Sequence, residues 1–347
     1  MKEKLLGKSL DELKDIVALL GLPKFTANQV AQWLYSKKVD SIEEMTNLSK
    51  TARARLSEDY EIGKLSYTQV EASVDGTKKY LFPVKADSAI EAVMIPDNDR
   101  RTLCVSSQSG CKLACKFCMT GRQGFHGHLS TADIISQFLA IDECSQLTNT
   151  VFMGMGEPLD NYKNVIKAIE ILTAPWGFAW SPKRITVSTI GVLPFLRKFL
   201  DETRCHLALS LHNPFSDERL AFMPIEKVYP VKDVVDLISE YDFSGQRRVS
   251  FEYTMFSGFN DSKRHADALA RMLKGIECRV NLIRFHKIPD FQYEPTPIKV
   301  MESFRDRLNR AGLVSTIRTS RGEDILAACG MLAGQNNNKC DSHAPNK

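Results

Sequence analysis

The chain has 347 residues, of which 43% are hydrophobic and 25% charged, so it is long enough to bury a sizeable core in one large domain and one smaller one. No apolar run approaches the roughly 20 residues that cross a bilayer, and residues 1–15 carry alternating charges instead of the apolar stretch of a signal peptide. A net charge of +4 does not by itself indicate a nucleic-acid partner. Composition therefore predicts a soluble, cytoplasmic protein with no membrane contact.

Residues 1–65 are predicted to form a small helical domain. Ser9 and Glu12 have the spacing of a capping box at the start of a helix that stops at Gly21-Leu22-Pro23. A second helix is expected over residues 27–38, and Ser41-Ile42-Glu43-Glu44 repeats the capping pattern.

Residues 66–100 are predicted to form a short β-hairpin extension and a linker region. The hairpin strands, 66–71 and 79–84, flank Asp75-Gly76, a pair that favours a tight turn. No stretch rich in glycine and serine separates the helical domain from the rest of the chain, so we expect the two parts to pack directly on each other.

Strand and helix patterns alternate from residue 101 onward. The expected strands are 102–106, 150–153, 184–188, 206–211, 249–254 and 279–285, and the expected helices are 131–143, 162–172, 193–200, 231–241, 262–273 and 301–311. Six strand–helix units predict an α/β fold with a parallel sheet and crossover helices. They are too few for a closed eight-stranded barrel and too regular for a sandwich. Ligands of such sheets gather at the carboxyl ends of the strands. Residues 335–347 form a polar tail that is expected to be disordered.

Nine cysteines in a cytoplasmic chain favour metal binding or catalysis over a disulfide framework. Three of them stand in one short segment, Cys111-Lys-Leu-Ala-Cys115-Lys-Phe-Cys118. Cys144, Cys205 and Cys278 lie in apolar surroundings and are interpreted as small buried residues, and Cys340, in the polar tail, as incidental.

The three clustered cysteines Cys111, Cys115 and Cys118 lie between a predicted strand and a predicted helix. Three thiolates bind three irons of a [4Fe–4S] cluster and leave the fourth iron open. An open iron chelates the amino and carboxylate groups of S-adenosylmethionine (SAM), and electron transfer then yields a 5′-deoxyadenosyl radical. The alternative is a zinc site in which the same cysteines are joined by His126 or His128.

A second motif favours the cluster over zinc. Gly154-Met155-Gly156-Glu157-Pro158 ends the next predicted strand. Glycines let the backbone approach a ligand closely, and a carboxylate accepts hydrogen bonds from an ammonium. Together the two motifs predict a radical SAM enzyme with one [4Fe–4S] cluster.

With these motifs in place, nearly the whole chain resembles the RlmN/Cfr family of radical SAM proteins, which methylates adenosine in ribosomal RNA. The resemblance rests on Leu103-Cys104-Val105-Ser106-Ser107-Gln108, Gly110 to Cys118, Gly124-Phe125, Gly154 to Leu159, Ser188-Thr189, Leu209-Ser210-Leu211-His212, Arg321-Gly322-Glu323-Asp324-Ile325 and Ala328-Cys329-Gly330. It implies a partial (β/α)6 radical SAM barrel over 101–334 that ends in a catalytic loop. It also implies that 1–65 binds RNA.

The resemblance assigns cofactor-binding roles residue by residue. Gly156 and Glu157 are expected to contact the methionine amino group. Ser188 and the segment Ser210, Leu211 and His212 are expected to hold the carboxylate and ribose ends of SAM. His286 stands where family members commonly carry Asn, and its imidazole can still bond a ribose hydroxyl or an adenine edge.

The resemblance also implies a catalytic set of Cys329, Cys104 and Glu91. Two SAM molecules are used per turnover: the first methylates Cys329, and the second supplies the radical that removes hydrogen from this methyl group. The resulting methylene radical adds to C2 of adenine, an electron-poor carbon that cannot attack a methyl sulfonium itself. Cys104 then attacks the sulfur of Cys329 and leaves a disulfide, and Glu91 accepts the C2 proton.

Each catalytic assignment has a structural alternative. Cys104 suits a buried thiol in an apolar strand, Cys329 suits a packing residue, and Glu91 suits an exposed carboxylate on a strand. Phe125 and Arg122, just after the cluster segment, suit contacts with RNA, although a core position suits Phe125 equally.

The implied substrate is an adenosine in the peptidyl-transferase region of 23S ribosomal RNA, together with the adenosine beside the tRNA anticodon in some members. The implied electron donor is a flavodoxin or ferredoxin, and a monomer is expected. The nearest rival activity is Cfr-type methylation at C8. Two further alternatives are a non-catalytic iron–sulfur or zinc protein that binds RNA, and a radical SAM enzyme for a small molecule.

Overall fold

The computed structural model of the chain describes residues 2–85, 88–245 and 247–333. The predicted disordered tail, 335–347, lies outside these residues. Within the described ranges, no helix combines the length and the apolar character needed to span a membrane.

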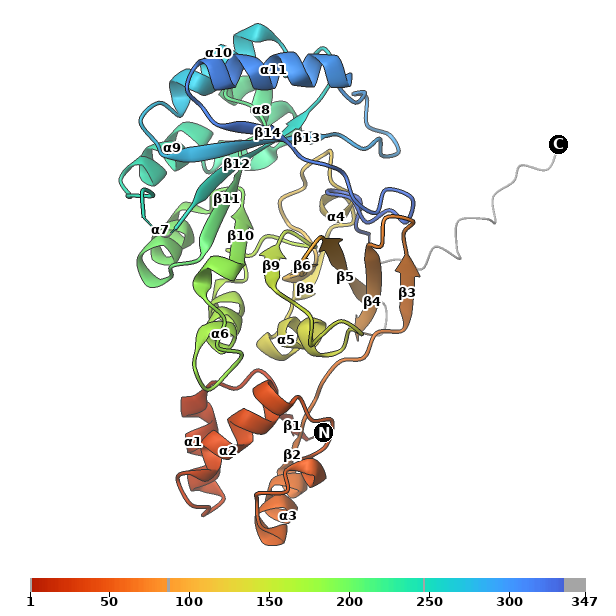
Figure 1. Cartoon of the computed structure of the whole chain (residues 1–347), viewed down its shortest axis with the longest axis vertical. Coiled ribbons are helices and arrows are strands. Elements are labelled where there is room, and N and C mark those ends of the chain that lie inside the picture. The colour runs from red at the N-terminus through yellow and green to blue at the C-terminus, as the bar shows by residue number, and fades with distance from the viewer. Residues whose placement is uncertain (1, 86–87, 246, 334–347) are drawn as a thin grey trace, which may run out of the picture.

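A ten-stranded sheet forms the centre of the molecule, with the strand order β14-β13-β12-β11-β10-β9-β6-β5-β4-β3 (Figure 1). Neighbouring strands from β6 to β14 run parallel. These strands are β6 (Arg100–Cys104), β9 (Asn149–Phe152), β10 (Ile185–Thr189), β11 (His206–Ser210), β12 (Val249–Met255), β13 (Cys278–Arg284) and β14 (Ser315–Ile317). The α/β class and the six predicted strands are confirmed. The short strand β14 is an addition that the sequence analysis missed.

Helices connect the parallel strands and bury one apolar face each. In α6, for example, Val165, Ala168, Ile169 and Leu172 are buried at the spacing of a single helical face. The connecting helices are α5 (Thr131–Leu139), α6 (Tyr162–Thr173), α7 (Leu193–Glu202), α8 (Ser216–Phe222), α9 (Val231–Ser239), α10 (Lys263–Met272) and α11 (Ile298–Arg310), with the 3-10 helices Pro182–Arg184 and Pro224–Lys227. The two faces of the central strands differ: in β12, Val249, Phe251, Tyr253 and Met255 are apolar and buried on one face, and Ser250, Glu252 and Thr254 stand on the other.

An antiparallel extension continues the same sheet beyond β6. Its strands are β3 (Gln69–Ala72), β4 (Lys78–Lys85) and β5 (Ser88–Asp97). The predicted hairpin is present as β3 and β4, and Gly76 takes a positive φ of 85° in its turn. The segment 88–97 is a full strand instead of a linker: residues 90–94 are all buried, and the segment pairs with both β4 and β6.

The N-terminal unit consists of short helices held by one pair of parallel strands, β1 (Glu3–Lys4) and β2 (Tyr60–Glu61). Its helices are α1 (Leu10–Leu19), α2 (Thr26–Ala31), a π-helix (Gln32–Lys37), a 3-10 helix (Ile42–Glu44) and α3 (Lys50–Asp59). Both predicted capping boxes form, at Ser9 and at Ser41. The predicted second helix changes from α to π geometry at Gln32.

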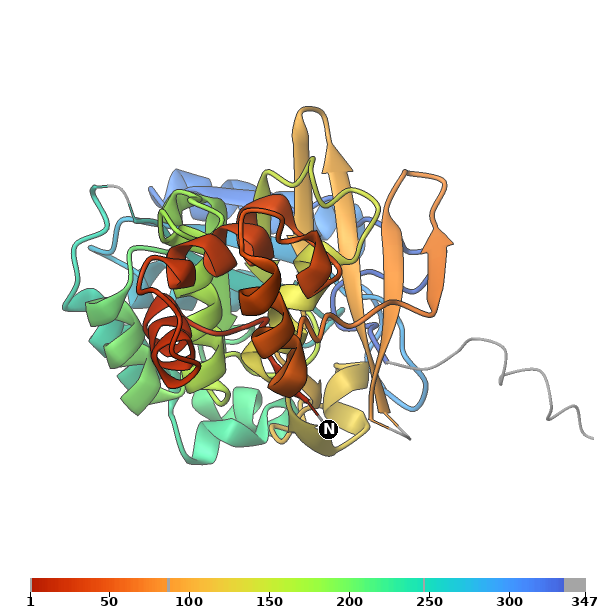
Figure 2. The same ribbon diagram turned by 90° about the horizontal axis from the view of Figure 1, so that it is seen from below.

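The N-terminal unit packs directly against α5, α6 and the segment after α6 (Figures 1 and 2). Lys167 Nζ lies 2.6 and 2.8 Å from the two carboxylate oxygens of Glu12. The ring of Tyr35 lies 5.8 Å from that of Trp176. One apolar core cluster therefore runs from this unit into the sheet.

Candidate active site

A cavity of about 260 Å³ opens at the carboxyl ends of the parallel strands. Its walls include most of the predicted site residues, namely Cys111, Cys115, Cys118, Gly156, Glu157, Ser188, Ser210, His212, His286 and Cys329. Three predicted residues are not among the lining residues: Cys104, Glu91 and Leu211. The structure thus brings predicted residues from six separate segments to one hollow.

The loop that carries the three clustered cysteines begins after β7 (Gln108–Gly110), which pairs with β8 (Phe125–His128). Cys111 N–H donates to the Gly124 carbonyl across 2.9 Å. A side chain at Gly110 would place its Cβ 1.9 Å from the same carbonyl oxygen, so only glycine fits there. Cys118 N–H donates to the Cys115 carbonyl across 3.1 Å, which closes a turn before α4 (Met119–Arg122).

Burial keeps the three clustered thiols in their neutral form unless a positively charged partner is present. Burial raises the pKa of Cys111 to about 12, and it also raises the pKa values of Cys115 and Cys118. Charge on Cys118 and Cys111 raises the pKa of Cys115 further. Bound metal cations reverse this tendency, because they stabilise the thiolate form.

The described residues contain no group of three His, Cys, Asp or Glu side chains that could hold a single metal ion. A [4Fe–4S] cluster takes one thiolate per iron, so its three cysteines need not converge on one ion. Cys111, Cys115 and Cys118 all line the cavity, and three thiolates are the number that leaves one iron of such a cluster open.

The glycine-rich segment after β9 packs closely against the loop that follows β6 and against the start of β7. Gly156 has a φ of 95°, and an added Cβ would lie 2.4 Å from Gln108 Cβ. A Cβ at Gly154 would lie 2.7 Å from the Val105 carbonyl oxygen. Glu157 N–H donates to Gln108 Oε1 across 2.8 Å. The glycines therefore permit a close approach that fixes Glu157 in the cavity wall.

The carboxylate of Glu157 is buried. It accepts hydrogen bonds from backbone N–H groups but, among the described residues, has no ion-pair partner. Its oxygens accept from Leu159 N–H at 3.0 Å and from Ile190 N–H at 3.1 Å. Burial raises the pKa of Glu157 to about 7 against the opposing effect of these hydrogen bonds. A carboxylate in this state gains most from a ligand cation, and the ammonium of an amino acid fits that requirement.

His212 contributes a neutral imidazole to the same cavity. Its backbone is left-handed, with a φ of 57°, and its Nδ1 accepts from Thr254 N–H across 3.0 Å. Burial lowers the pKa of His212 to about 3, and the Arg219 charge lowers it further. Because Nδ1 accepts, the proton of the neutral ring resides on Nε2, which is then a hydrogen-bond donor.

Leu211 differs from its neighbours, because its side chain is fully buried in the apolar core. Its main chain, however, is held firmly: Arg219 Nε donates to the Leu211 carbonyl across 2.9 Å, and an Arg219 Nη donates to the Ser210 carbonyl across 3.0 Å. Arg219 is itself buried and paired with Glu226. This arginine fixes the end of β11 from behind the cavity.

His286 bonds protein groups at both ring nitrogens. Its Nε2 lies 3.0 Å from Ser320 Oγ, and its Nδ1 lies 3.3 Å from Glu323 Oε1. Burial lowers the pKa of His286, while Glu323 opposes that shift. The imidazole therefore connects the end of β13 to the segment that leads to Cys329.

The segment that carries Cys329 lies beside α4 and the antiparallel extension (Figure 1). Its residues 327–330 form part of the cavity wall. Met119 N–H donates to the Gly330 carbonyl across 2.8 Å, and Thr120 Oγ donates to the Leu332 carbonyl across 2.8 Å. Cys329 is exposed, yet loss of water around its sulfur raises the pKa of the thiol.

Cys104, at the end of β6, is buried close to Cys329. Burial raises the pKa of Cys104 to about 12, and charge on Cys329 raises it further. The Arg318 guanidinium has the opposite effect on both thiols. The two cysteines, which are distant in the sequence, are therefore close enough in the structure for charge on one to shift the pKa of the other.

Glu91 is buried in β5 instead of being exposed on the strand. Its Oε2 accepts from Ala333 N–H across 2.7 Å, and its Oε1 lies 3.5 Å from Lys79 Nζ. This carboxylate therefore contacts the segment that follows Cys329, although it does not line the cavity itself.

Two family models match the chain: the radical SAM superfamily over residues 105–269, and the ribosomal RNA large subunit methyltransferase N-terminal domain over residues 3–62. A "Probable dual-specificity RNA methyltransferase RlmN" of Porphyromonas gingivalis is 55% identical over 329 residues, which cover 95% of this chain and 96% of the relative. The chain belongs to the RlmN family of radical SAM RNA methyltransferases.

Two further comparisons agree with the RlmN family. The "Dual-specificity RNA methyltransferase RlmN" of Syntrophus aciditrophicus is 39% identical, with 94% of this chain and 95% of the relative covered. The crystal structure of a radical SAM methyltransferase from Sphaerobacter thermophilus has a TM-score of 0.90 at 36% identity, with 96% of this chain and 99% of that chain covered. Membership in this enzyme family implies SAM and a [4Fe–4S] cluster and contradicts the non-catalytic alternative.

Several cavity residues of this RlmN protein were missed by the sequence analysis. They come from β12 and from the segment after β14, namely Glu252, Thr254, Arg318, Thr319 and Ser320. The apolar run before Ile317, directly after the turn at Gly312, is the signal that could have located β14 and the polar residues that follow it.

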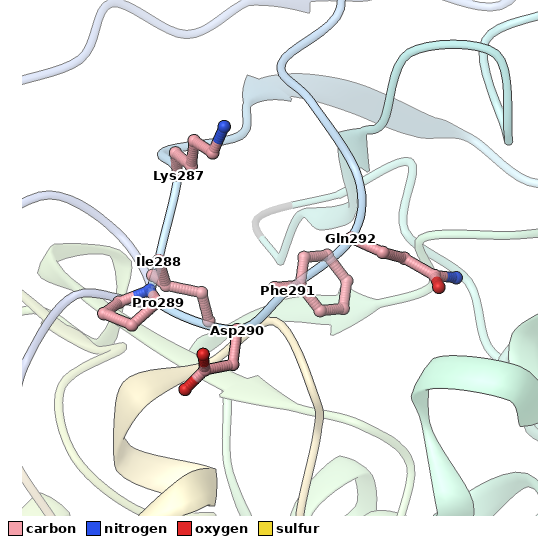
Figure 3. Close-up of a pocket in the computed structure, with 6 residues that line it drawn as sticks. All are labelled: Lys287, Ile288, Pro289, Asp290, Phe291 and Gln292. Carbon is pink, nitrogen blue, oxygen red and sulfur yellow. The ribbon is translucent and has the colours of Figure 1, made fainter.

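A second hollow lies on the outer side of the cluster loop. The segment 287–292 after β13 lines a surface pocket (Figure 3). Arg122 of α4 donates to the Pro289 carbonyl and lies 3.4 Å from Asp290. Arg122 therefore bonds to the segment after β13 in this structure. The ring of Phe125 lies against Lys112, whose Nζ is 4.4 Å from the ring centroid.

Proposed function

We propose that this RlmN protein methylates C2 of an adenosine in 23S ribosomal RNA and of an adenosine in tRNA, through a methylated Cys329. The observation that carries the proposal is the hydrogen bond between Met119 and Gly330, which couples the end of the cluster loop to the residue after Cys329. A protein that only binds RNA does not need a reactive sulfur beside the cluster loop. Such a sulfur suits an enzyme whose own cysteine carries the methyl group.

The cavity suits the proposed cofactors. Cys111, Cys115 and Cys118 would hold the cluster, and Glu157 would accept hydrogen bonds from the amino group of SAM. His212 would donate from Nε2, while Ser188 and the end of β11 would contact the remaining polar groups. When bound, the cluster and SAM supply the carbon radical that the reaction requires. Two SAM molecules are used per turnover in this proposal, one as the methyl donor and one as the radical source.

The protein groups then act in sequence. The Cys329 sulfur attacks the methyl carbon of one SAM and becomes a thioether, with S-adenosylhomocysteine as the leaving group. After one hydrogen atom is removed from this methyl group, its carbon bonds to C2 of adenine, and the adduct loses one electron, which the cluster would take back. Glu91 accepts the C2 proton. The Cys104 thiolate attacks the Cys329 sulfur, so that an S–S bond forms while the S–C bond breaks. The released carbon takes up a proton and becomes the methyl group.

The partners follow from the same proposal. The relatives are named dual-specificity RNA methyltransferases, which supports two RNA substrates and the C2 branch over the Cfr-type C8 branch. The electron donor would be a flavodoxin or ferredoxin. The exposed Lys112 and Lys116 on the cluster loop would favour its acidic surface. We propose a monomer that acts in the cytoplasm, where ribosomes are.

The test is mass spectrometry of adenosines in ribosomal RNA and tRNA from a deletion strain, with and without the restored gene. The proposal expects 2-methyladenosine to disappear and then to return with the protein. Appearance of 8-methyladenosine instead would assign the C8 branch. If neither base changes in either RNA, the RNA substrate is wrong.

A further inference from the structure

Lys79 is a buried lysine at the junction of three segments. Its side chain is 6% exposed. An ammonium out of water is strongly unfavourable unless it is paired and hydrogen-bonded. Lys79 Nζ donates to the Ile325 carbonyl across 2.6 Å and lies 3.2 Å from Glu71 Oε2 and 3.5 Å from Glu91 Oε1.

The strand register explains why the three charged side chains meet. Glu71 of β3 stands directly opposite Lys79 of β4. Lys79 pairs with Val93 of β5, and Glu91 is the diagonal neighbour two residues along that strand. Directly opposite and diagonal residues of adjacent strands share one face of a sheet. The face in question is the one that the Cys329 segment covers.

The same group of contacts fixes the Cys329 segment on both sides of the cysteine. Lys79 binds the carbonyl of Ile325, and Glu91 binds the N–H of Ala333. Cys329 stands midway between these two residues in the sequence. Because Lys79 also contacts Glu91, a single ion pair connects the two anchoring points.

We propose that Lys79 is a positioning residue that holds the Glu91 carboxylate and the 325–333 segment in one fixed arrangement. The inference rests on the proposed roles of Glu91 and Cys329. In this arrangement the sulfur that carries the methylene group and the carboxylate that accepts the C2 proton keep a constant separation. Lys79 itself touches neither RNA nor cofactor, and its ammonium offsets the repulsion between Glu71 and Glu91.

The test compares Lys79→Met with Lys79→Arg in the reconstituted full-length enzyme. Lys78→Met is the matched control, because Lys78 is the neighbour on the same strand and pairs with Glu143 at 2.6 Å, away from this group. A double variant, Lys79→Met with Glu71→Gln, removes one positive and one negative charge together. It therefore keeps the net charge of this group at its wild-type value and can be used if the single variant unfolds.

Three quantities are measured: amide hydrogen exchange over 325–333, methylation of Cys329 by SAM, and methylation of RNA. In Lys79→Met we expect exchange over this segment to rise at least about tenfold and RNA methylation to fall about a hundredfold, as for a misplaced catalytic group. Cys329 methylation should stay within about twofold, since it needs no Glu91, and KM for RNA should change little. Lys79→Arg should restore much of the loss, and the double variant should behave like Lys79→Met.

Several outcomes would overturn the proposal. These are unchanged RNA methylation in Lys79→Met, an equal loss in Lys78→Met, or unchanged exchange over 325–333. The proposed role of Glu91 is tested separately with Glu91→Gln. If that variant retains RNA methylation, the function of Glu91 is wrong, whereas faster exchange in Lys79→Met would still show that Lys79 anchors the segment.

Discussion

The N–H of Met119 donates a hydrogen bond to the carbonyl oxygen of Gly330 across 2.8 Å. Met119 directly follows Cys118, a proposed cluster ligand, and Gly330 directly follows Cys329. A single main-chain hydrogen bond thus connects the proposed radical source to the proposed methyl carrier. Main-chain atoms have little freedom to move relative to their own Cβ, so this contact limits the separation of the two sulfurs.

Gly330→Ala should therefore impair catalysis more than stability. Gly330 has a φ of 83°, and an added Cβ would lie 3.3 Å from the Phe117 carbonyl oxygen. The strain in φ should cost about 1 kcal/mol of unfolding free energy. The close contact should also shift the segment, so we expect RNA methylation to fall at least about tenfold while the cluster absorbance is retained.

Gly275→Ala is a matched control for this prediction. Gly275 has a similar φ of 89°, but nothing lies within 4 Å of the added Cβ. Both variants should lose a similar amount of stability in denaturant unfolding, and only Gly330→Ala should lose methylation. Equal activities of the two variants would show that the position of Gly330 does not matter for Cys329.

Binding of SAM should depend on pH through Glu157. The pKa of Glu157 is about 7 because the carboxyl is buried, and only its ionised form pairs with an ammonium. The affinity for SAM should therefore rise about tenfold per pH unit below pH 7 and level off above it. Equilibrium dialysis of the reconstituted enzyme measures this dependence.

Glu157→Gln should bind SAM weakly and remove this pH dependence. The variant should also change the stability of the unliganded protein. A carboxyl whose folded pKa is raised contributes stability below its unfolded value of 4.5, and this contribution is lost as the pH rises through 7. The Gln variant should lack this decline, and a wild-type pH profile of binding in Glu157→Gln would contradict the assignment.

The sequence was sufficient to locate the residues whose chemistry depends on local spacing. The three clustered cysteines and Gly154–Glu157 needed only their own motifs, and the six longer parallel strands needed only short stretches of continuous or alternating apolar residues. Contacts between distant segments could not be predicted in the same way. For example, Arg219 holds the end of β11 because of the path that the chain takes after this strand. Lys79 meets Glu71 and Glu91 because of the register between neighbouring strands.

One omission has a physical reason. Strand β14 is only three residues long and contains a single apolar residue, Ile317, so the short apolar signal before it does not stand out from a turn. The contact of Leu211 with SAM stays a prediction: its side chain is buried in the core, which leaves its main chain for such a contact. The roles of Cys329, Cys104 and Glu91 came from the family resemblance, not from any local pattern.

Cys329 and Cys104, the two cysteines with proposed catalytic roles, should differ in reactivity toward a small alkylating reagent. Cys329 is exposed in the cavity, whereas Cys104 is buried with a pKa of about 12. The thiolate is the reactive form, so Cys329 should react at least about tenfold faster at mildly alkaline pH. Cys205 is a suitable internal control, because its thiol is also buried with a pKa of about 12 but lies outside the site.

Peptide mass spectrometry of the cluster-loaded enzyme gives the three rates. Cys104 and Cys205 should be labelled equally slowly. Labelling of Cys104 as fast as Cys329 would show that Cys104 is more accessible than its burial indicates.

Cys329→Ala should retain the cluster and lose all RNA methylation, and methyl transfer by that variant would disprove the role of Cys329.

The stability of the cavity wall should depend on two properties of His212, its left-handed backbone and its acceptor at Nδ1. Asparagine tolerates a positive φ and offers a carbonyl oxygen, so His212→Asn should lose no more than about 1 kcal/mol. In His212→Ala, the Thr254 N–H loses its partner and the backbone remains strained. We expect a loss of about 2–3 kcal/mol in denaturant unfolding. Equal losses in the two variants would mean that Nδ1 contributes nothing to the fold. If both keep the cluster but bind SAM more weakly than the wild type, the Nε2–H donor contributes to cofactor binding independently of stability.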